Sequence, residues 1–330
     1  MGTSPSPDGP LQFLAAHEAE VRHWLEGVDL TPRVYAHSAE EMEEVPPGSV
    51  DLIVTSPPYP MVERWDALFA RVLGLPSFPR DSGDFDRAHV YLDRVWEDCR
   101  RVLRPGGILA VNIGDATRTV GGRFLCYPNH TRVTEALRRG GLEPLVPILW
   151  KKPTNKPNAF LGSGFLPPNA YVTLDCEHIL LFRKPGRPPP PDPPFRRHAS
   201  QYSRAERDLW FSQIWEIRGA PQRRETAPFP EEIPRRLVRM FSCLGDTVLD
   251  PFAGSGTTLR VARAWGRRAL GYELDLSLAS QMDLPPGPPT VQEILDRIRA
   301  EYTDAPRALP QLPERSPLPG PGTRQGDMPK

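Results

Sequence analysis

Residues 248–258, Val-Leu-Asp-Pro-Phe-Ala-Gly-Ser-Gly-Thr-Thr, combine residue types that suit the binding of a nucleotide-like ligand. The apolar start is typical of a covered parallel strand, and the strand runs into a glycine-rich turn. Gly254 and Gly256 let the backbone turn tightly and approach a ligand, because neither carries a Cβ atom. A helix that begins near Thr257 directs its unpaired N–H groups at the same place. The stretch alone therefore predicts a nucleotide-like ligand at a helix start.

A carboxylate follows at the end of the next expected strand, residues 268–274, which we expect to lie beside the first. The carboxylate of Glu273 can accept protons from both hydroxyl groups of a ribose. Together with the glycine turn it predicts a nucleoside pocket. The spacing is Gly-x-Gly without the third glycine of the dinucleotide fingerprint, and Asp250-Pro251 precedes it, which disfavours NAD.

A third group of residues, Thr55-Ser56-Pro57-Pro58-Tyr59, ends the expected strand at residues 50–55. Consecutive prolines fix φ and carry no N–H, so the carbonyl of Pro57 points where the rigid chain places it. Ligands of open parallel sheets bind outside the carboxyl ends of the strands. We therefore expect this segment to meet the nucleoside pocket, although alone it also fits a simple strand-ending turn.

Helices and strands must alternate along the chain to position these residues. Apolar periodicity predicts helices at residues 11–26, 90–103, 131–139, 230–241 and 258–263. Short apolar runs predict strands at residues 34–36, 50–55, 108–113, 144–150, 177–182, 248–249 and 268–274. Residues 61–82 are expected to be irregular. This order is typical of an α/β fold with a doubly wound, mostly parallel sheet and helices on both faces.

Composition excludes several classes of protein. The sequence of 330 residues carries no long apolar segment and no signal peptide, so we expect a cytoplasmic protein without a membrane span. Four widely spaced cysteines, without Cys-x-x-Cys or histidine pairs at ligand spacing, predict reduced thiols and no metal site.

Formal net charge is zero, but the charges are unevenly distributed along the chain. Residues 183–224 hold ten bases and four acids, and residues 118–156 hold eight bases and two acids. Local basic surfaces on a neutral protein fit the binding of a polyanion by one face. Solvated charge runs are the alternative.

The Thr-Ser-Pro-Pro-Tyr segment followed by the glycine turn resembles the S-adenosylmethionine-dependent DNA amino-methyltransferases. Their β group has this order, with the catalytic motif before the cofactor motif. Residues 101–107, 112–115, 150–153, 177–184 and 227–230 are similar to segments of that family, and the resemblance covers about residues 34–280. It implies a Rossmann-like class I methyltransferase fold with a circularly permuted motif order.

The resemblance also implies roles for individual residues. The side chain of Ser56 and the carbonyl of Pro57 accept the two protons of the target amino group, Pro58 stiffens the motif, and Tyr59 stacks on a base that has left the helix. Residues implied to bind S-adenosylmethionine are Pro228, Phe229, Asp250, Phe252, Ala253, Gly254, Ser255, Gly256, Thr257, Thr258 and Glu273. Methylation at ring carbon 5 is disfavoured, because it needs a thiolate and no Pro-Cys is present.

Serine in the Ser-Pro-Pro-Tyr motif favours N4 of cytosine in duplex DNA as the target. N6 of adenine is the alternative, followed by an RNA methyltransferase and a non-catalytic nucleic-acid-binding module. Target recognition is expected from residues 152–169 and 183–224. Basic side chains that could clamp phosphates or read guanine edges are Lys151, Lys152, Arg196, Arg197, Arg204 and Arg207.

The domain organisation follows from the same motifs. We expect an N-terminal helical segment at 1–30, a catalytic half at 31–183, a target-recognition insert at 184–224, a cofactor-binding half at 225–284, and a proline-rich C-terminal helix with a disordered tail at 285–330. Expected partners are double-stranded DNA, a second copy of the chain, and a restriction endonuclease that acts on the same site.

Overall fold

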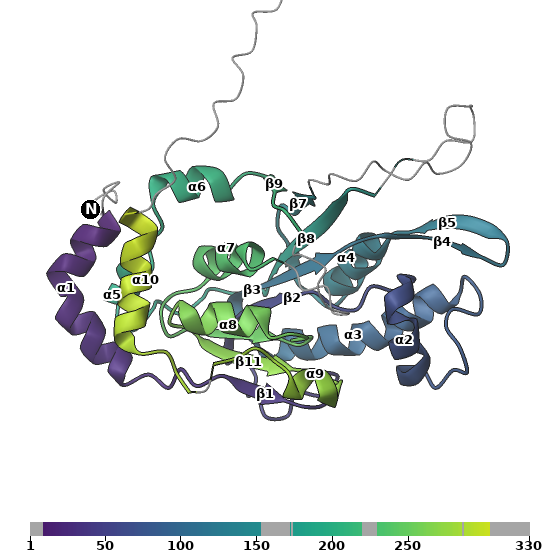
Figure 1. Cartoon of the computed structure of the whole chain (residues 1–330), viewed down its shortest axis with the longest axis horizontal. Helices are drawn as coiled ribbons and strands as arrows, with labels where there is room; N and C mark the ends of the chain where they lie inside the picture. Colours follow the sequence, from purple (N-terminus) through teal and green to yellow (C-terminus); the bar gives the residue numbers. More distant parts are fainter. Residues whose placement is uncertain (1–8, 153–171, 173, 220–229, 286, 304–330) are drawn as a thin grey trace, which may run out of the picture.

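A computed structural model describes residues 9–152, 172, 174–219, 230–285 and 287–303 (Figure 1). Its main sheet has the strand order β1 (Arg33–Tyr35), β11 (Arg268–Tyr272), β10 (Thr247–Asp250), β2 (Val50–Thr55), β3 (Leu103–Ile113), β8 (Cys176–Arg183), β7 (Ile148–Lys151) and β9 (Ile214–Glu216). The first five strands in this order, β1, β11, β10, β2 and β3, are parallel to one another. Strand β8 is antiparallel to β3 and β7, and β9 runs parallel to β7. The short β6 (Glu143–Pro144) also pairs with β8. The predicted α/β fold with a mostly parallel sheet is confirmed.

Helices cover both faces of this sheet. One apolar core lies under α7 (Glu232–Phe241) and α8 (Thr257–Ala264) and continues to α1 (Gly9–Glu26) and α10 (Val291–Thr303). The other lies under α2 (Asp66–Val72), α3 (Asp84–Val102) and α4 (Asn129–Arg139). Figure 1 shows α1, α5 (Phe195–Ala199) and α10 together at one end of the molecule. Strand residues alternate between the two cores, as expected for a sheet that is buried on both faces.

Helix α3 begins six residues before the expected start at residue 90. Its apolar face includes Leu92, Val95 and Cys99, all buried at helical spacing. The apolar pattern did not predict the first turn, because that turn is stabilised by polar contacts. Asp84 accepts hydrogen bonds from Arg80 and Arg87. Acids in the first turn of a helix also interact favourably with the helix dipole.

Three segments contain more regular structure than their sequences indicated. Residues 61–82 were expected to be irregular, but they contain the 3-10 turn η1 (Glu63–Trp65) and α2. A hairpin of β4 (Ala116–Val120) and β5 (Arg123–Tyr127) follows β3 and projects from the sheet (Figure 1). The expected recognition insert contains α5, α6 (Arg204–Trp210) and β9, and β9 joins the main sheet through β7.

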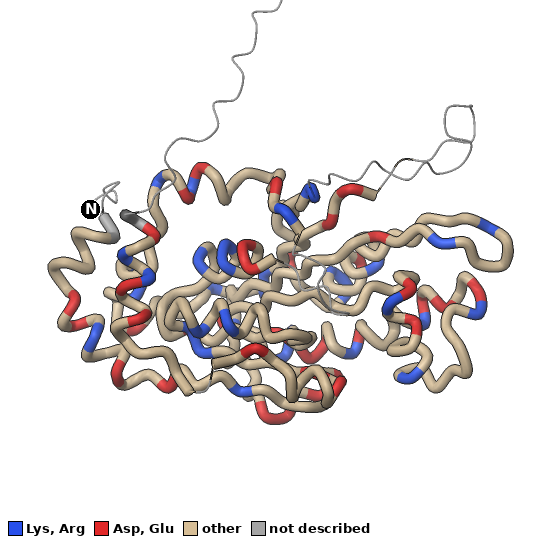
Figure 2. The backbone as a smooth tube through the Cα atoms, viewed as in Figure 1, with Lys and Arg blue, Asp and Glu red and all other residues tan. Residues whose placement is uncertain are grey.

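Basic and acidic residues are interspersed along most of the backbone, in keeping with the zero net charge (Figure 2). The clearest exception is the turn after β1, where Glu40, Glu41, Glu43 and Glu44 gather beside Asp98. Such a surface would repel a polyanion. No helix of the described residues is both long and apolar enough to cross a membrane.

Candidate active site

The two predicted motifs meet at the carboxyl edge of the sheet, because β10 pairs directly with β2. At the end of these strands the Thr55 hydroxyl donates a 2.6 Å hydrogen bond to Asp250 Oδ1, and the Phe252 N–H donates to the same oxygen at 3.1 Å. Asp250 is only 1% exposed. Burial raises its pKa to about 6, although the hydrogen bond from Thr55 acts in the opposite direction. The buried carboxylate of Asp250 therefore links the two motifs through hydrogen bonds.

The glycine turn after β10 has the conformation that its sequence requires. Gly254 and Gly256 have φ values of +52° and +79°, which residues with a side chain rarely adopt. Helix α8 begins at Thr257. The Gly254 N–H donates to Glu273 Oε2 at 2.8 Å, and the Asp275 N–H donates to Oε1 at 2.8 Å. Each oxygen keeps lone-pair capacity for a further hydrogen bond. The Glu273 carboxylate is thus held by the backbone with capacity to bind a diol.

A hollow opens between the two motifs. Its lining includes the predicted residues Ser56, Pro58, Phe252, Ala253, Gly254, Ser255, Thr257 and Glu273. Three predicted cofactor residues, Asp250, Gly256 and Thr258, do not line it. Pro228 and Phe229 lie outside the described residues. The sequence interpretation missed the remaining lining residues, His37, Ser38, Ala39, Trp65, Leu68, Tyr91, Pro251, Tyr272, Leu274 and Leu278.

Tyr59 anchors a hydrogen-bond network beside this hollow. Its hydroxyl lies 3.0 Å from Ser56 Oγ and donates to Glu177 Oε2 at 2.9 Å. The Asn112 side-chain amide donates to the Tyr59 hydroxyl at 2.8 Å and to Glu177 Oε2 at 2.7 Å. Lys152 forms an ion pair with the other oxygen of Glu177. Five side chains from four separate segments are therefore connected.

Burial, followed by the nearby negative charge of Glu177, raises the pKa of Tyr59 well above its usual range. The phenol therefore stays protonated at neutral pH and remains a donor to Glu177. Its ring packs against Gly114, where an added Cβ would lie 3.1 Å from Tyr59 Cε2. Asn112 and Glu177 had no predicted role. Asn112 lies near the end of β3, and Glu177 reaches the same edge of the sheet because β8 runs antiparallel to β3.

The predicted DNA-binding side chains fall into two groups. Lys151, Arg197, Arg204 and Arg207 are exposed. Lys152 and Arg196 are instead engaged within the protein. The guanidinium of Arg196 donates to the Leu244 carbonyl at 2.7 Å and pairs with Asp246 at 2.5 Å. Arg196 therefore connects α5 to the turn before β10.

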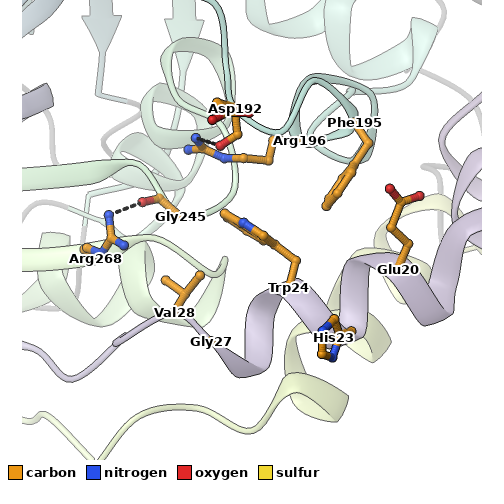
Figure 3. A pocket seen from close by; sticks show the side chains of 10 residues that line it. All are labelled: Glu20, His23, Trp24, Gly27, Val28, Asp192, Phe195, Arg196, Gly245 and Arg268. Carbon is orange, nitrogen blue, oxygen red and sulfur yellow. Dashed lines mark hydrogen bonds between the residues drawn. The ribbon is translucent and has the colours of Figure 1, made fainter.

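A second hollow, of about 610 Å³, lies at the opposite end of β10 and β11, next to α1 (Figure 3). Trp24 and Phe195 meet there edge to face, with ring centroids 6.0 Å apart. The Arg268 and Arg196 side chains that border it donate to backbone carbonyls, at Gly245 and Asp192 respectively. It contains no predicted site residue except Arg196, so the carboxyl-edge hollow is the candidate active site.

The carboxyl-edge hollow fits S-adenosylmethionine. Glu273 suits the ribose, the aromatic and aliphatic side chains of Tyr91, Phe252 and Leu278 suit an adenine ring, and Ser255 and Thr257 supply hydroxyl groups at the start of α8. Ser56 borders the same space. A methyl donor held there would therefore lie next to the Ser-Pro-Pro-Tyr segment.

Comparison with known proteins agrees with this geometry. The family model N6_N4_Mtase, described as DNA methylase, matches residues 50–282. Type II methyltransferase M.MjaI of Methanocaldococcus jannaschii is 52% identical over 277 residues, which cover 76% of this chain and 90% of the relative. Type II methyltransferase M.MthZI of Methanothermobacter thermautotrophicus is 43% identical over 260 residues, which cover 74% of this chain and 73% of the relative.

Among solved structures, TTHA0409 of Thermus thermophilus, complexed with S-adenosyl-L-methionine, is similar with a TM-score of 0.61 and 35% identity. The match covers 83% of this chain and 97% of that one. Three observations agree: the order of the motifs, the hollow that both motifs line, and the similarity to these proteins. The chain belongs to the S-adenosylmethionine-dependent DNA amino-methyltransferases of the N4/N6 family.

Proposed function

We propose that this protein methylates the N4 amino group of cytosine in duplex DNA, as the methyltransferase of a restriction–modification system. The observation that carries the proposal is Ser56, which borders the cofactor hollow and lies 3.0 Å from the Tyr59 hydroxyl. Type II methyltransferases M.MjaI and M.MthZI support the restriction–modification setting. A serine rather than an aspartate before Pro-Pro-Tyr favours cytosine over adenine.

An exocyclic amine is a poor nucleophile, because its lone pair is delocalised into the ring. Hydrogen-bond acceptors that hold its two protons out of the ring plane make that lone pair available. Ser56 Oγ and the carbonyl of Pro57 are proposed as these acceptors, with the two prolines fixing the backbone. S-adenosylmethionine supplies an electrophilic methyl group on a sulfonium centre. The protein contributes mainly by positioning the amine.

The amine must lose a proton once it carries the methyl group. Ser56 Oγ, the Tyr59 hydroxyl and Glu177 Oε2 form a continuous path with steps of 3.0 Å and 2.9 Å. A proton accepted by Ser56 can pass to Tyr59 as the phenolic proton moves to Glu177, so the phenol is never left ionised. Lys152 offsets the charge of Glu177 from the other side. We assign Glu177 as the terminal proton acceptor.

Target DNA must reach Ser56 from the carboxyl edge of the sheet. Duplex bases are not accessible there without extrusion, which costs a few kcal/mol. Tyr59 keeps its proposed role as a stacking surface, with its hydroxyl held by Asn112 and Glu177. Residues 184–224 stay the proposed recognition segment, with Arg197, Arg204 and Arg207 as exposed phosphate or base contacts.

The experiment is to methylate duplex DNA with purified protein, digest the product to nucleosides and identify the modified base by mass. N4-methyldeoxycytidine is expected from the wild type, and a large loss of product from Ser56→Ala. N6-methyldeoxyadenosine as the product would overturn the cytosine assignment. Methylation of RNA but not of DNA would favour the RNA alternative, and full activity of Ser56→Ala would remove Ser56 from the mechanism.

A further inference from the structure

We propose that Asp115, His130 and His178 form a binding site for a borderline divalent cation of the Zn²⁺ class. Each offers one ligand atom, and these atoms all lie within 4.8 Å of one another. They come from three separate places: the connection between β3 and β4, the first turn of α4 and the start of β8. This cluster plays no part in the methyl transfer proposed above. The proposal departs from the expectation of no metal site, which considered only ligands close together in the sequence.

The three side chains are held together by specific contacts. His130 Nδ1 lies 2.8 Å from each oxygen of Asp115, and the His130 backbone N–H donates to Asp115 Oδ1 at 3.1 Å. The rings of His130 and His178 are stacked, with centroids 3.9 Å apart and planes 9° from parallel. His178 is positioned by its pairing with Ile113 on β3. The backbone therefore fixes all three Cα positions before any ion binds.

Two imidazoles and one carboxylate form a donor set that suits Zn²⁺ and its neighbours in the first transition series. Mg²⁺ and Ca²⁺ prefer oxygen ligands, so they are not expected here. The His130 side chain is 32% exposed and that of Asp115 is 11% exposed. An ion thus has an entry path, and water can complete its coordination.

Binding requires a small rearrangement of the rings. A metal ion lies in the plane of each imidazole that binds it, at about 2.0–2.1 Å from the nitrogen. Two parallel stacked rings cannot both meet this condition for one ion, so one must turn about its Cβ–Cγ bond. That torsion joins sp³ and sp² atoms and is soft. We therefore expect cation binding to unstack His130 from His178.

The site would tie together three elements next to the catalytic network. Asp115 immediately precedes the β4–β5 hairpin, His130 belongs to the first turn of α4, and His178 follows Glu177. A bound ion would join the hairpin and α4 to the strand that presents Glu177. Its expected role is structural, because no ligand contacts Ser56 or Tyr59 in the described hydrogen bonds.

The test uses the full-length protein, stripped of metal with a chelator and dialysed. Titration with Zn²⁺ by calorimetry should show one equivalent bound, and Co²⁺ should give the visible absorption of a bound ion. His130→Ala, His178→Ala and Asp115→Asn should each weaken Zn²⁺ binding at least about tenfold. His23→Ala, at an exposed histidine on α1, should bind as the wild type does.

Less than one equivalent of Zn²⁺ bound by the wild type would overturn the proposal, as would unchanged affinity in all three cluster variants. Should a cluster variant fail to fold by circular dichroism, histidine side-chain NMR of the wild type replaces it. Zn²⁺ must then shift the imidazole nitrogen signals of both His130 and His178. Unchanged signals for either ring would also overturn the site.

Discussion

The Thr55 hydroxyl donates a 2.6 Å hydrogen bond to the buried carboxylate of Asp250, although 195 positions separate the two residues. Thr55 precedes the catalytic segment directly, and Asp250 precedes the glycine turn of the cofactor hollow. This contact therefore links the segment proposed to hold the target amine to the turn that borders the proposed cofactor hollow. A hydrogen bond to a charged group of this kind contributes about 1.5–3 kcal/mol to stability.

The first prediction concerns the pH dependence of stability. Burial raises the pKa of Asp250 from 3.8 to about 6, so the folded state binds this proton more tightly than the unfolded state does. The proton on Asp250 adds about 3 kcal/mol to the free energy of unfolding below pH 4, and this contribution is lost as the pH rises through about 6. Urea unfolding between pH 4 and 7 should show this decline in the wild type, relative to Asp250→Asn.

Thr55→Val provides the matched variant, since it removes the donor that favours the ionised carboxylate. The midpoint of the decline should move to higher pH in this variant. Identical pH profiles of the wild type and Asp250→Asn would show that Asp250 does not titrate in this range.

The second prediction separates the ring of Tyr59 from its hydroxyl. Tyr59→Phe keeps a stacking surface but removes the link between Ser56 and Glu177. We expect kcat to fall by about 10²-fold, because proton transfer by a positioned group contributes on this scale. Affinity for S-adenosylmethionine, measured by calorimetry, should be unchanged. A fall in cofactor affinity equal to the fall in kcat would contradict both assigned roles.

The third prediction addresses Glu177 as the terminal proton acceptor. Glu177→Gln keeps the size of the side chain but removes the negative charge that Lys152 pairs with. Turnover should fall at least about tenfold, because the terminal proton acceptor is lost. Glu216→Gln is the control, because Glu216 also pairs with a lysine, Lys151, yet is exposed on β9. Turnover of Glu177→Gln equal to that of the wild type would contradict the role of Glu177 as proton acceptor.

The fourth prediction tests the ribose contact. Glu273→Ala should weaken S-adenosylmethionine binding by at least about tenfold, because two charge-assisted hydrogen bonds are lost. Asp283→Asn, at an exposed acid near α8, should leave the affinity unchanged. Calorimetry on both variants makes the comparison. Wild-type affinity in Glu273→Ala would remove this carboxylate from the pocket.

The fifth prediction distinguishes the arginines of residues 184–224. Arg204 and Arg207 are 79% and 67% exposed at their side chains. If both contact phosphates, Arg204→Gln with Arg207→Gln should lower the slope of log Kd against log salt by about 1.8. Arg139→Gln, on the exposed end of α4, should leave the slope as it is. An unchanged slope in the double variant would place DNA elsewhere.

Several features follow from the sequence alone. The buried strands at residues 50–55 and 248–249 and the glycine turn after the second of them were predictable, because apolar runs and glycines restrict the backbone locally. The motif order was enough to indicate a permuted methyltransferase. Ser56, Glu273 and the glycine turn line one hollow, since parallel neighbouring strands bring their carboxyl ends to the same edge.

Other features were decided by the tertiary structure. Periodicity does not reveal strand direction, so nothing local showed that β8 runs antiparallel and brings its first residues, Glu177 and His178, to the carboxyl edge. Helix α2 and the β4–β5 hairpin were missed, because packing outweighs weak local patterns in such short elements.

Contacts between distant residues could not be predicted for the same reason. Arg196 belongs to a basic stretch, and only the fold places Asp246 and the Leu244 carbonyl against its guanidinium. His130 and His178 are 48 positions apart and are neighbours because α4 packs against β8. Local sequence thus determined which elements form and what the motifs can bind, whereas long-range packing determined which polar side chains meet.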